Sequence, residues 1–266
     1  MTPVEMIRGD GPIVLGLPHT GTYVPPDVAE KLNENGRLLA DTDWHVDRLY
    51  EGLLAGATTV RATFHRYVID ANRDPEGGSL YPGQNTTGLV PLTDFDGNAI
   101  WDEAPDASEI DRRRAAFHRP YHAAMKEELE RVRARHGVAI LYDCHSIRSE
   151  IPFLFEGRLP DFNIGTNLGA TCASSIERTV LDICAKADGY ETILNGRFKG
   201  GWTTRHYGNP AENIHAIQME LAQSTYLSAE APPWGYDTKK AARLREPLAQ
   251  ILTALAQLAP ILKGSS

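Results

Sequence analysis

Apolar runs alternate with amphipathic segments along the whole chain. Residues 13–18 (IVLGLP) and 138–144 (VAILYDC) are nearly continuous apolar runs, typical of strands that are covered on both faces of a sheet. Residues 41–56 carry their valine and leucines at helical spacing. By the same criteria we expect further strands within 58–70 and at 214–222, and further helices at 107–136, 166–188 and 238–262. This alternation predicts an α/β fold, a three-layer sandwich with a mixed, largely parallel sheet.

The pattern offers no obvious point at which to divide the chain. It contains no internal repeat, no low-complexity tract and no long linker, so we expect residues 1–266 to form a single domain. Pro120 predicts a kink or break in the helix over 107–136. The helix over 166–188 is expected to end near Gly189.

Two segments interrupt the alternation. Residues 73–104 are rich in Gly and Pro and have no period, and loops of this length inside a domain are commonly active-site lids. Residues 195–210 are also rich in glycine and carry Arg197, Lys199 and Arg205. Both segments could be plain surface loops, or they could form the walls of a site for an anion.

Charge and composition narrow the class of partner. The chain has 27 Lys and Arg against 35 Asp and Glu, a net charge of −8, and its pI is about 5.6. Nucleic acid is therefore not an expected partner, because phosphate binding needs a basic surface. Apolar residues make up 42% of the chain, which excludes wholesale disorder. A local basic pocket for a small anionic substrate remains compatible with this balance.

The sequence also favours a reducing compartment. No apolar run approaches the roughly 18 residues that a membrane span requires, and the start of the chain does not resemble a signal peptide. The three cysteines form no CxxC pair, so neither a disulfide framework nor a thiolate zinc site is expected. We expect a cytoplasmic protein with no membrane partner.

Two histidines follow predicted buried strands. His19 comes after the run at 13–18, and His145 after the run at 138–144. Ligands of open α/β sheets bind beyond the carboxyl ends of the strands, so these two imidazoles could converge on one metal ion. Either histidine alone could simply cap its strand end, but the pair favours a metal site.

A hydrolytic zinc site commonly takes two histidines and one carboxylate. Asp43 and Asp47 lie four residues apart in the predicted helix and so share one face. Asp43 suits the start of a helix for electrostatic reasons alone, whereas Asp47 lies deeper in it. We therefore expect Asp47 to be the ligand, with Asp43 as the alternative or as a partner that orients a ligand imidazole.

Three further residues have side chains suited to hydrolysis of an anionic substrate. Glu220 lies in a predicted strand on the face opposite the apolar positions, where it could be a general base or form a salt bridge. Asn72 and Arg73 follow a predicted strand and could clamp a carboxylate, since a guanidinium binds it in bidentate fashion. The alternative for Arg73 is an ion pair with Asp70.

Seven segments, taken together and in order, resemble the N-formylglutamate amidohydrolase family. They are LPHTGTYVP (17–25), DTDWHVDRLYEG (41–52), RYVIDANRDPEG (66–77), LYDCHSIRSEIP (141–152), NIGTNLG (163–169), GRFKGGWTTRHYG (196–208) and IQMELAQSTYL (217–227). Each segment is weak by itself, whereas the ordered set is specific. The resemblance covers roughly residues 10 to 260.

The resemblance implies a zinc-carboxypeptidase-like fold and a metal-dependent amidohydrolase. The implied reaction converts N-formyl-L-glutamate to L-glutamate and formate in histidine degradation, with zinc as the expected metal. By position, the implied ligands are His19, Asp47 or Asp43, and His145, with Glu220 as the base. Asn72 and Arg73, helped by Arg197, Lys199 or Arg205, would bind the substrate carboxylates. The alternatives are a related amidohydrolase for another N-acyl amino acid or small peptide, and a non-catalytic binding domain of the same fold.

Overall fold

The computed structural model describes residues 1–78, 83 and 85–262, and the strands in this part form one mixed sheet. The strands are β1 (Val4–Ile7), β2 (Ile13–Leu17), β3 (Thr58–Ala62), β4 (Ala139–Ile147), β5 (Phe162–Gly165), β6 (Thr192–Leu194) and β7 (Ile214–Ala222), in the order β1-β3-β2-β4-β7-β5-β6. Strands β3, β2, β4 and β7 are parallel, whereas β1 and β5 pair antiparallel with β3 and β7. The predicted α/β class with a mixed, largely parallel sheet is confirmed.

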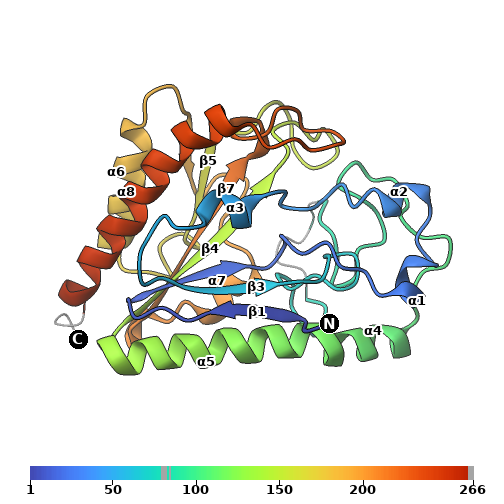
Figure 1. Ribbon diagram of the computed structural model, residues 1–266, viewed down its shortest axis with the longest axis horizontal. Helices are drawn as coiled ribbons and strands as arrows, with labels where there is room; N and C mark the ends of the chain where they lie inside the picture. Colours follow the sequence, from blue (N-terminus) through green and yellow to red (C-terminus); the bar gives the residue numbers. More distant parts are fainter. Residues whose placement is uncertain (79–82, 84, 263–266) are drawn as a thin grey trace.

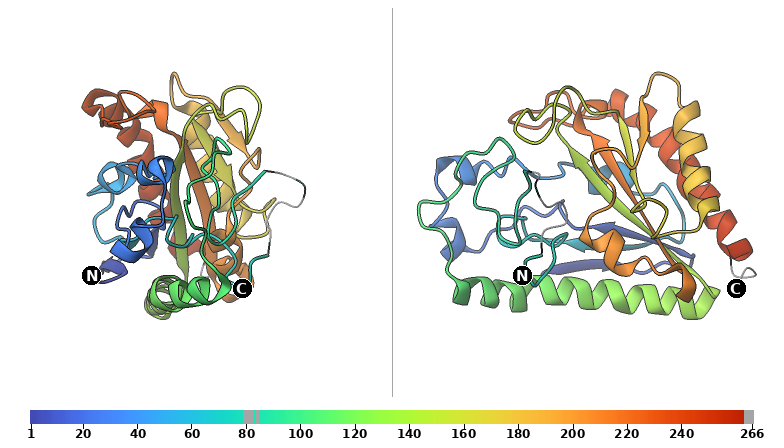
Figure 2. Two further views of the ribbon diagram at one scale, coloured as in Figure 1. Left: turned by 90° about the vertical axis from the view of Figure 1, so that its right-hand side faces the viewer. Right: turned by 180° about the vertical axis from the view of Figure 1, so that it is seen from behind.

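Helices cover both faces of this sheet, as Figures 1 and 2 show. They are α1 (Pro26–Ala29), α2 (Glu34–Arg37), α3 (Val46–Tyr50), α4 (Ala107–Arg113), the π-helical turn η1 (Arg114–His118), α5 (Arg119–His136), α6 (Ser174–Lys186), α7 (Trp202–Tyr207), the short 3₁₀ turns η2 (Pro210–Glu212) and η3 (Gln223–Thr225), and α8 (Thr238–Leu262). Apolar residues of α3, α6 and α8 pack on one face, and those of α5 pack on the other. Within the described residues, no helix is long and apolar enough to cross a membrane.

The predicted helix over 107–136 is present, with a change of helical type inside it. Helices α4 and α5 are joined by the π turn, and Pro120 lies in the first turn of α5, where a missing backbone N–H is tolerated. Helix α5 ends at His136, and the following Gly137 has a φ of 78°, the left-handed conformation that favours glycine. The predicted break near Pro120 is therefore a π turn just before the proline.

The region 41–70 differs most from the sequence-based expectation. The helix predicted over 41–56 is only the five-residue α3, because His45 adopts a left-handed φ of 60° at its start and Gly52 a φ of 70° after its end. Strand β3 stops at Ala62. The apolar residues after it are buried in turns rather than in a second strand, so their hydrophobicity reports burial and not strand geometry.

Smaller differences occur in the second half. The helix expected over 166–188 begins only at Ser174, after the unpredicted strand β5 and a turn. Strands β1 and β6 are also unpredicted, since they are four and three residues long and do not give a clear period. Helix α7 lies within the segment 195–210, which had been expected as a loop. The segment 73–104 has no helix or named strand in its described part, and residues 79–82 and 84 lie outside the described residues.

The site is built where the parallel strands end. Strands β2, β4 and β7 have their carboxyl ends at the same edge of the sheet. His145 of β4 is the register partner of Glu220 of β7, and His19 follows β2 by two residues. The topology therefore gathers these three side chains at one edge, as expected for a ligand site in an α/β sheet.

Candidate active site

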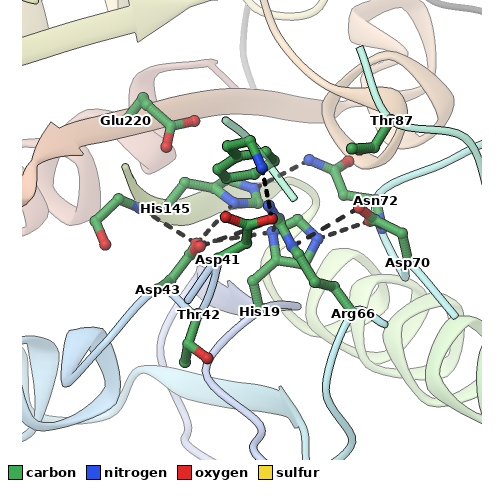
Figure 3. A network of polar contacts seen from close by, with 12 residues as sticks. His19, Asp41, Thr42, Asp43, Arg66, Asp70, Asn72, Thr87, His145 and Glu220 are labelled. Atoms are coloured by element: carbon green, nitrogen blue, oxygen red, sulfur yellow. Dashed lines mark hydrogen bonds and ion pairs between the residues drawn. The ribbon is translucent and has the colours of Figure 1, made fainter. Parts of the chain in front are cut away.

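Two imidazoles and one carboxylate meet at this edge, all of them buried. His19, Asp43 and His145 each offer one ligand atom, and these atoms lie within 4.8 Å of one another. Asp43 Oδ2 is 3.2 Å from His145 Nδ1 and 3.7 Å from His19 Nδ1. Figure 3 shows the three side chains pointing toward one another from three separate segments.

The structure places Asp43, and not the expected Asp47, beside the two histidines. Asp47 Oδ2 lies 2.9 Å from Arg61 Nη1, and the Asp47 side chain lines a separate surface groove of about 690 Å³. Asp43 lies in the loop before α3, and its own backbone N–H donates to the His19 carbonyl at 3.1 Å. This bond holds the Asp43 side chain beside the histidines. The argument from helical spacing failed because residues 41–45 are not helical.

The far nitrogen of each imidazole faces a second carboxylate. His19 Nε2 is 2.7 Å from Asp70 Oδ1, and His145 Nε2 is 3.1 Å from Asp143 Oδ1. A carboxylate behind the ligand histidine is a recurrent feature of metal sites, because it orients the ring and raises its basicity. Both Nδ1 atoms are thereby turned toward Asp43. The donor set of two Nδ1 atoms and one carboxylate fits a divalent cation such as zinc.

Opposite charges hold these groups ionised despite their burial. Burial alone would raise the pKa of Asp43, but the imidazoles of His19 and His145 and the Arg66 guanidinium hold it well below its usual range. The pKa of Asp70 is likewise low, since His19, Arg73 and Arg66 outweigh the effect of burial. The pKa of His145 is raised well above its usual value, because Asp143, Asp43 and Glu220 outweigh burial. The ionised carboxylates of the cluster therefore favour a positive charge between them.

Arg66 is a site residue that the sequence argument did not single out. Its guanidinium contacts His19 Nδ1 and lies 4.0 Å from Asp43 and 3.8 Å from Asp70. Its side chain is only 6% exposed, which is unusual for arginine unless it is paired. The one available signal was its position in the segment RYVIDANRD, at the end of which Asn72 and Arg73 lie.

Glu220 faces the same site from β7. It is buried, and Gln218 Nε2 donates a hydrogen bond of 3.0 Å to its Oε2. Burial raises the pKa of Glu220 to about 8, reinforced by the carboxylates of Asp43 and Asp143 and opposed by His145 and Arg66. A cation bound nearby would lower this pKa, because it favours the carboxylate form.

Asn72 and Arg73 lie beside the cluster. Asn72 Nδ2 is 3.2 Å from His145 Nε2, and Asn72 Oδ1 accepts a hydrogen bond of 2.8 Å from the Thr203 backbone N–H. The Arg73 guanidinium donates to the carbonyl and hydroxyl oxygens of Thr87 and to the Asn72 carbonyl. It is also 3.8 Å from Asp70, so the ion pair considered from the sequence is present as well.

A small cavity of about 70 Å³ opens between these groups. It is lined by His19, Arg66, Asn72, Arg73, Thr86, Phe95, His145, Ser146, Ile147, Arg197, Phe198, Gly201, Gln218 and Glu220. Of the three loop cations expected from the sequence, Arg197 lines the cavity, whereas Lys199 and Arg205 do not. Arg205 lies on α7 and donates instead to the Gly200 carbonyl.

An α/β sheet that carries a buried His–Asp–His cluster beside a buried glutamate is an arrangement typical of metal-dependent hydrolases. Comparison with known proteins identifies the group more closely. The model of the family described as N-formylglutamate amidohydrolase matches residues 11–227. The chain belongs to this family.

Curated relatives and solved structures agree with this assignment. The N-formylglutamate deformylases of Pseudomonas aeruginosa and Pseudomonas putida are 47% and 46% identical over 251 residues, which cover 93% of this chain and 94% and 93% of theirs. The crystal structure of N-formylglutamate amidohydrolase from Ralstonia eutropha JMP134 has a TM-score of 0.80 at 27% identity and covers 97% of this chain and 98% of that one. A gene product from Agrobacterium tumefaciens shares the fold, with a TM-score of 0.71 at 18% identity over 96% of both chains.

Proposed function

We propose that this chain hydrolyses N-formyl-L-glutamate to L-glutamate and formate with the help of one divalent metal ion, zinc by the chemistry of its donors. The observation that carries the proposal is the His19–Asp43–His145 cluster, which opens on a cavity that Glu220 and Arg73 also line. The names of the curated relatives support the choice of substrate.

His19, Asp43 and His145 would hold the proposed metal. When bound, a divalent ion acts as a Lewis acid toward the formyl carbonyl and makes water more acidic. Asp70 and Asp143 keep the two rings oriented.

Glu220 serves as the general base. It takes a proton from water as the oxygen adds to the formyl carbon, and the C–O bond forms while the carbonyl π pair moves onto oxygen. The Arg66 guanidinium lies close enough to the cluster to stabilise that developing negative charge. When the C–N bond breaks, Glu220 returns the proton to the departing nitrogen, which leaves as the amine of glutamate.

Substrate recognition depends on cations that line the cavity, because the chain as a whole is acidic. Arg73 and the Asn72 amide are proposed to bind one carboxylate of the substrate, and Arg197 to assist with the other. Arg197 already donates to the carbonyls of Leu154 and Asn85, so it fixes the loops that border the cavity at the same time. Lys199 and Arg205 do not line the cavity, so we assign them no part in substrate binding.

We also propose the pathway and the compartment in which the chain acts. The family resemblance connects hydrolysis of N-formylglutamate with histidine degradation, and we place the chain in that pathway. The three cysteines are free thiols and all are buried, which supports a reducing cytoplasm as the compartment.

Metal analysis combined with a formate-release assay tests the proposal. We expect about one metal ion per chain, loss of formate release after chelation, and recovery after zinc is restored. N-formylglutamine, which lacks the side-chain charge, should be a much poorer substrate than N-formylglutamate. Equal rates on the two would refute the dicarboxylate site, and formate release that survives complete metal removal would refute the metal role.

A further inference from the structure

Two histidines outside the catalytic cluster hold the backbone on either side of Asn72. His122 Nε2 is 2.8 Å from the Ala71 carbonyl oxygen, and His118 Nε2 is 3.1 Å from the Arg73 carbonyl oxygen. The carbonyl between them, that of Asn72 itself, accepts a hydrogen bond of 3.0 Å from the Arg73 guanidinium. Three consecutive carbonyls are thus each bonded by a side-chain N–H.

The positions of the two histidines follow from the helix that carries them. His118 is the last residue of the π turn η1, and His122 lies four residues later in α5, so both project from one helix face. Their ring centroids are 4.3 Å apart. Further along the same face, Met125 and Leu129 pack in the core beneath the sheet. π turns are rare and occur often at functional sites.

Helix α7 holds Asn72 from the opposite side. The Thr203 N–H donates to Asn72 Oδ1, and the Trp202 ring packs against the rings of His122 and His118 at centroid distances of 4.7 and 5.7 Å. Asn72 is therefore fixed through its side chain by α7 and through its flanking peptides by the two histidines.

The hydrogen-bond pattern places a proton on Nε2 of both rings. A carbonyl oxygen can only accept, so Nε2 of each ring carries the proton. Nδ1 of His122 lies 3.0 Å from the oxygen of the Tyr207 hydroxyl, which itself donates to the His122 backbone carbonyl at 3.0 Å. Burial lowers the pKa of both histidines, that of His122 to about 3 with a contribution from His118.

We infer that His118 and His122 are positioning residues for substrate binding: they set the orientation of the Asn72–Arg73 segment and so aim its amide and guanidinium at a substrate carboxylate. This inference rests on the proposed role of Asn72 and Arg73 in binding that carboxylate. Neither histidine lines the cavity, so neither touches the substrate itself. Loss of the histidine bond to either carbonyl would allow that peptide group to rotate. The Asn72 amide and the Arg73 guanidinium would then no longer point at the substrate carboxylate.

The test compares Phe and Gln at both positions. His118→Phe and His122→Phe keep a ring but remove the donor, whereas His118→Gln and His122→Gln keep an amide nitrogen near the place of Nε2. Each Phe variant should raise the KM for N-formylglutamate roughly three- to tenfold, the effect of one lost hydrogen bond, and leave kcat within about threefold. The Gln variants should restore KM toward the wild-type value. Arg73→Ala gives the upper limit of the effect.

His136→Phe is the matched control. His136 lies on the same helix and makes the same kind of bond, from Nε2 to the Asp10 carbonyl at 2.8 Å, but far from the cavity along α5. It should leave KM unchanged. A purely structural role for His118 and His122 would lower the active fraction, and thus kcat, without changing KM. Unchanged KM in both Phe variants would therefore overturn the inference.

Glutarate binding separates this inference from the proposed function. Glutarate is a dicarboxylate without an amide, and calorimetry measures its binding without turnover. If the wild type releases no formate but binds glutarate, and the Phe variants bind it more weakly, the proposed reaction fails while the positioning role holds. If the wild type binds neither glutarate nor substrate, both fail.

Discussion

Asp43 and Asp47 show how little a residue type says about its role. Both are aspartates near the start of α3, and spacing alone puts both on one helical face. Asp43 is buried between two imidazoles, whereas the Asp47 side chain is 38% exposed and paired with Arg61. An exposed pair of this kind contributes little to stability. The two residues therefore make a natural pair of test and control.

Asp43→Asn should remove metal binding, and Asp47→Asn should not. Asparagine keeps the shape of the side chain but not the negative charge that the cation needs. We expect Asp43→Asn to weaken zinc affinity by more than the roughly 10- to 100-fold that changes in the outer partners of a ligand cost. Metal content after dialysis against a competing chelator measures this. Comparable metal loss in both variants would contradict the assignment of Asp43.

Glu220→Gln separates proton transfer from metal binding. Glutamine keeps the size of the side chain and its contact with Gln218, but it cannot accept a proton from water. Turnover should fall by about 10²- to 10⁴-fold, the usual contribution of a general base, while metal content stays at the wild-type level. Formate release and metal analysis on the same sample give both values. Near-normal turnover would exclude Glu220 as the base, and Asp143 would then be tested.

At the scale of elements, α7 connects residues that lie far apart in the chain. The Gly201 N–H just before it donates to Gln218 Oε1 at 2.6 Å, and Gln218 in turn contacts Glu220. Thr204 Oγ1 donates to Asp143 Oδ2 at 2.9 Å, behind His145. Together with the bond from Thr203 to Asn72, these bonds connect α7 to the proposed base Glu220, to Asp143 behind the proposed ligand His145, and to the proposed substrate-binding residue Asn72. This six-residue helix in a glycine-rich segment therefore helps to position three separate parts of the site.

Gly201→Ala tests this role of α7. A Cβ at position 201 would lie 2.6 Å from Asn72 Oδ1 and 2.7 Å from its Cγ, so the amide or the helix must move. We expect at least about tenfold lower kcat/KM, since a misplacement of 1 Å can cost far more than that. Gly235→Ala is the control, because its Cβ would meet only the short side chain of Ser228. Equal kcat/KM in the two variants would contradict this role, because it would show that the site tolerates a shift of α7 or of the Asn72 amide.

At the scale of the whole molecule, the sheet brings distant parts of the sequence to one edge. Three parallel strands, β2, β4 and β7, deliver His19, His145 and Glu220, and helices on both faces bury the sheet on which they stand. The loops that complete the site come from elsewhere: Asp43 before α3, and Arg66 to Arg73 after β3. Figure 3 shows Glu220 above the cluster, and His19, Asp43 and Arg66 below it.

The sequence by itself determined the α/β class, the main buried strands and the candidate residues His19, His145, Glu220, Asn72 and Arg73. The α/β class is confirmed because burial and periodicity are local properties, and the roles of the candidate residues stay predictions. The structure brings these residues together because parallel strands present their carboxyl ends at a common edge. The family resemblance depended in the same way on short segments in a fixed order.

Only the tertiary structure decided which charged groups meet. The approach of Asp43 rather than Asp47 to the histidines, and the positions of Arg66 and Asp70 beside them, depend on the paths of loops. Those paths are set by long-range contacts, such as the bond between the Asp43 N–H and the His19 carbonyl, and no local period encodes them. The pKa of each group then depends on these neighbours and on burial, which is why the electrostatics of the site follow from the fold and not from the residue types.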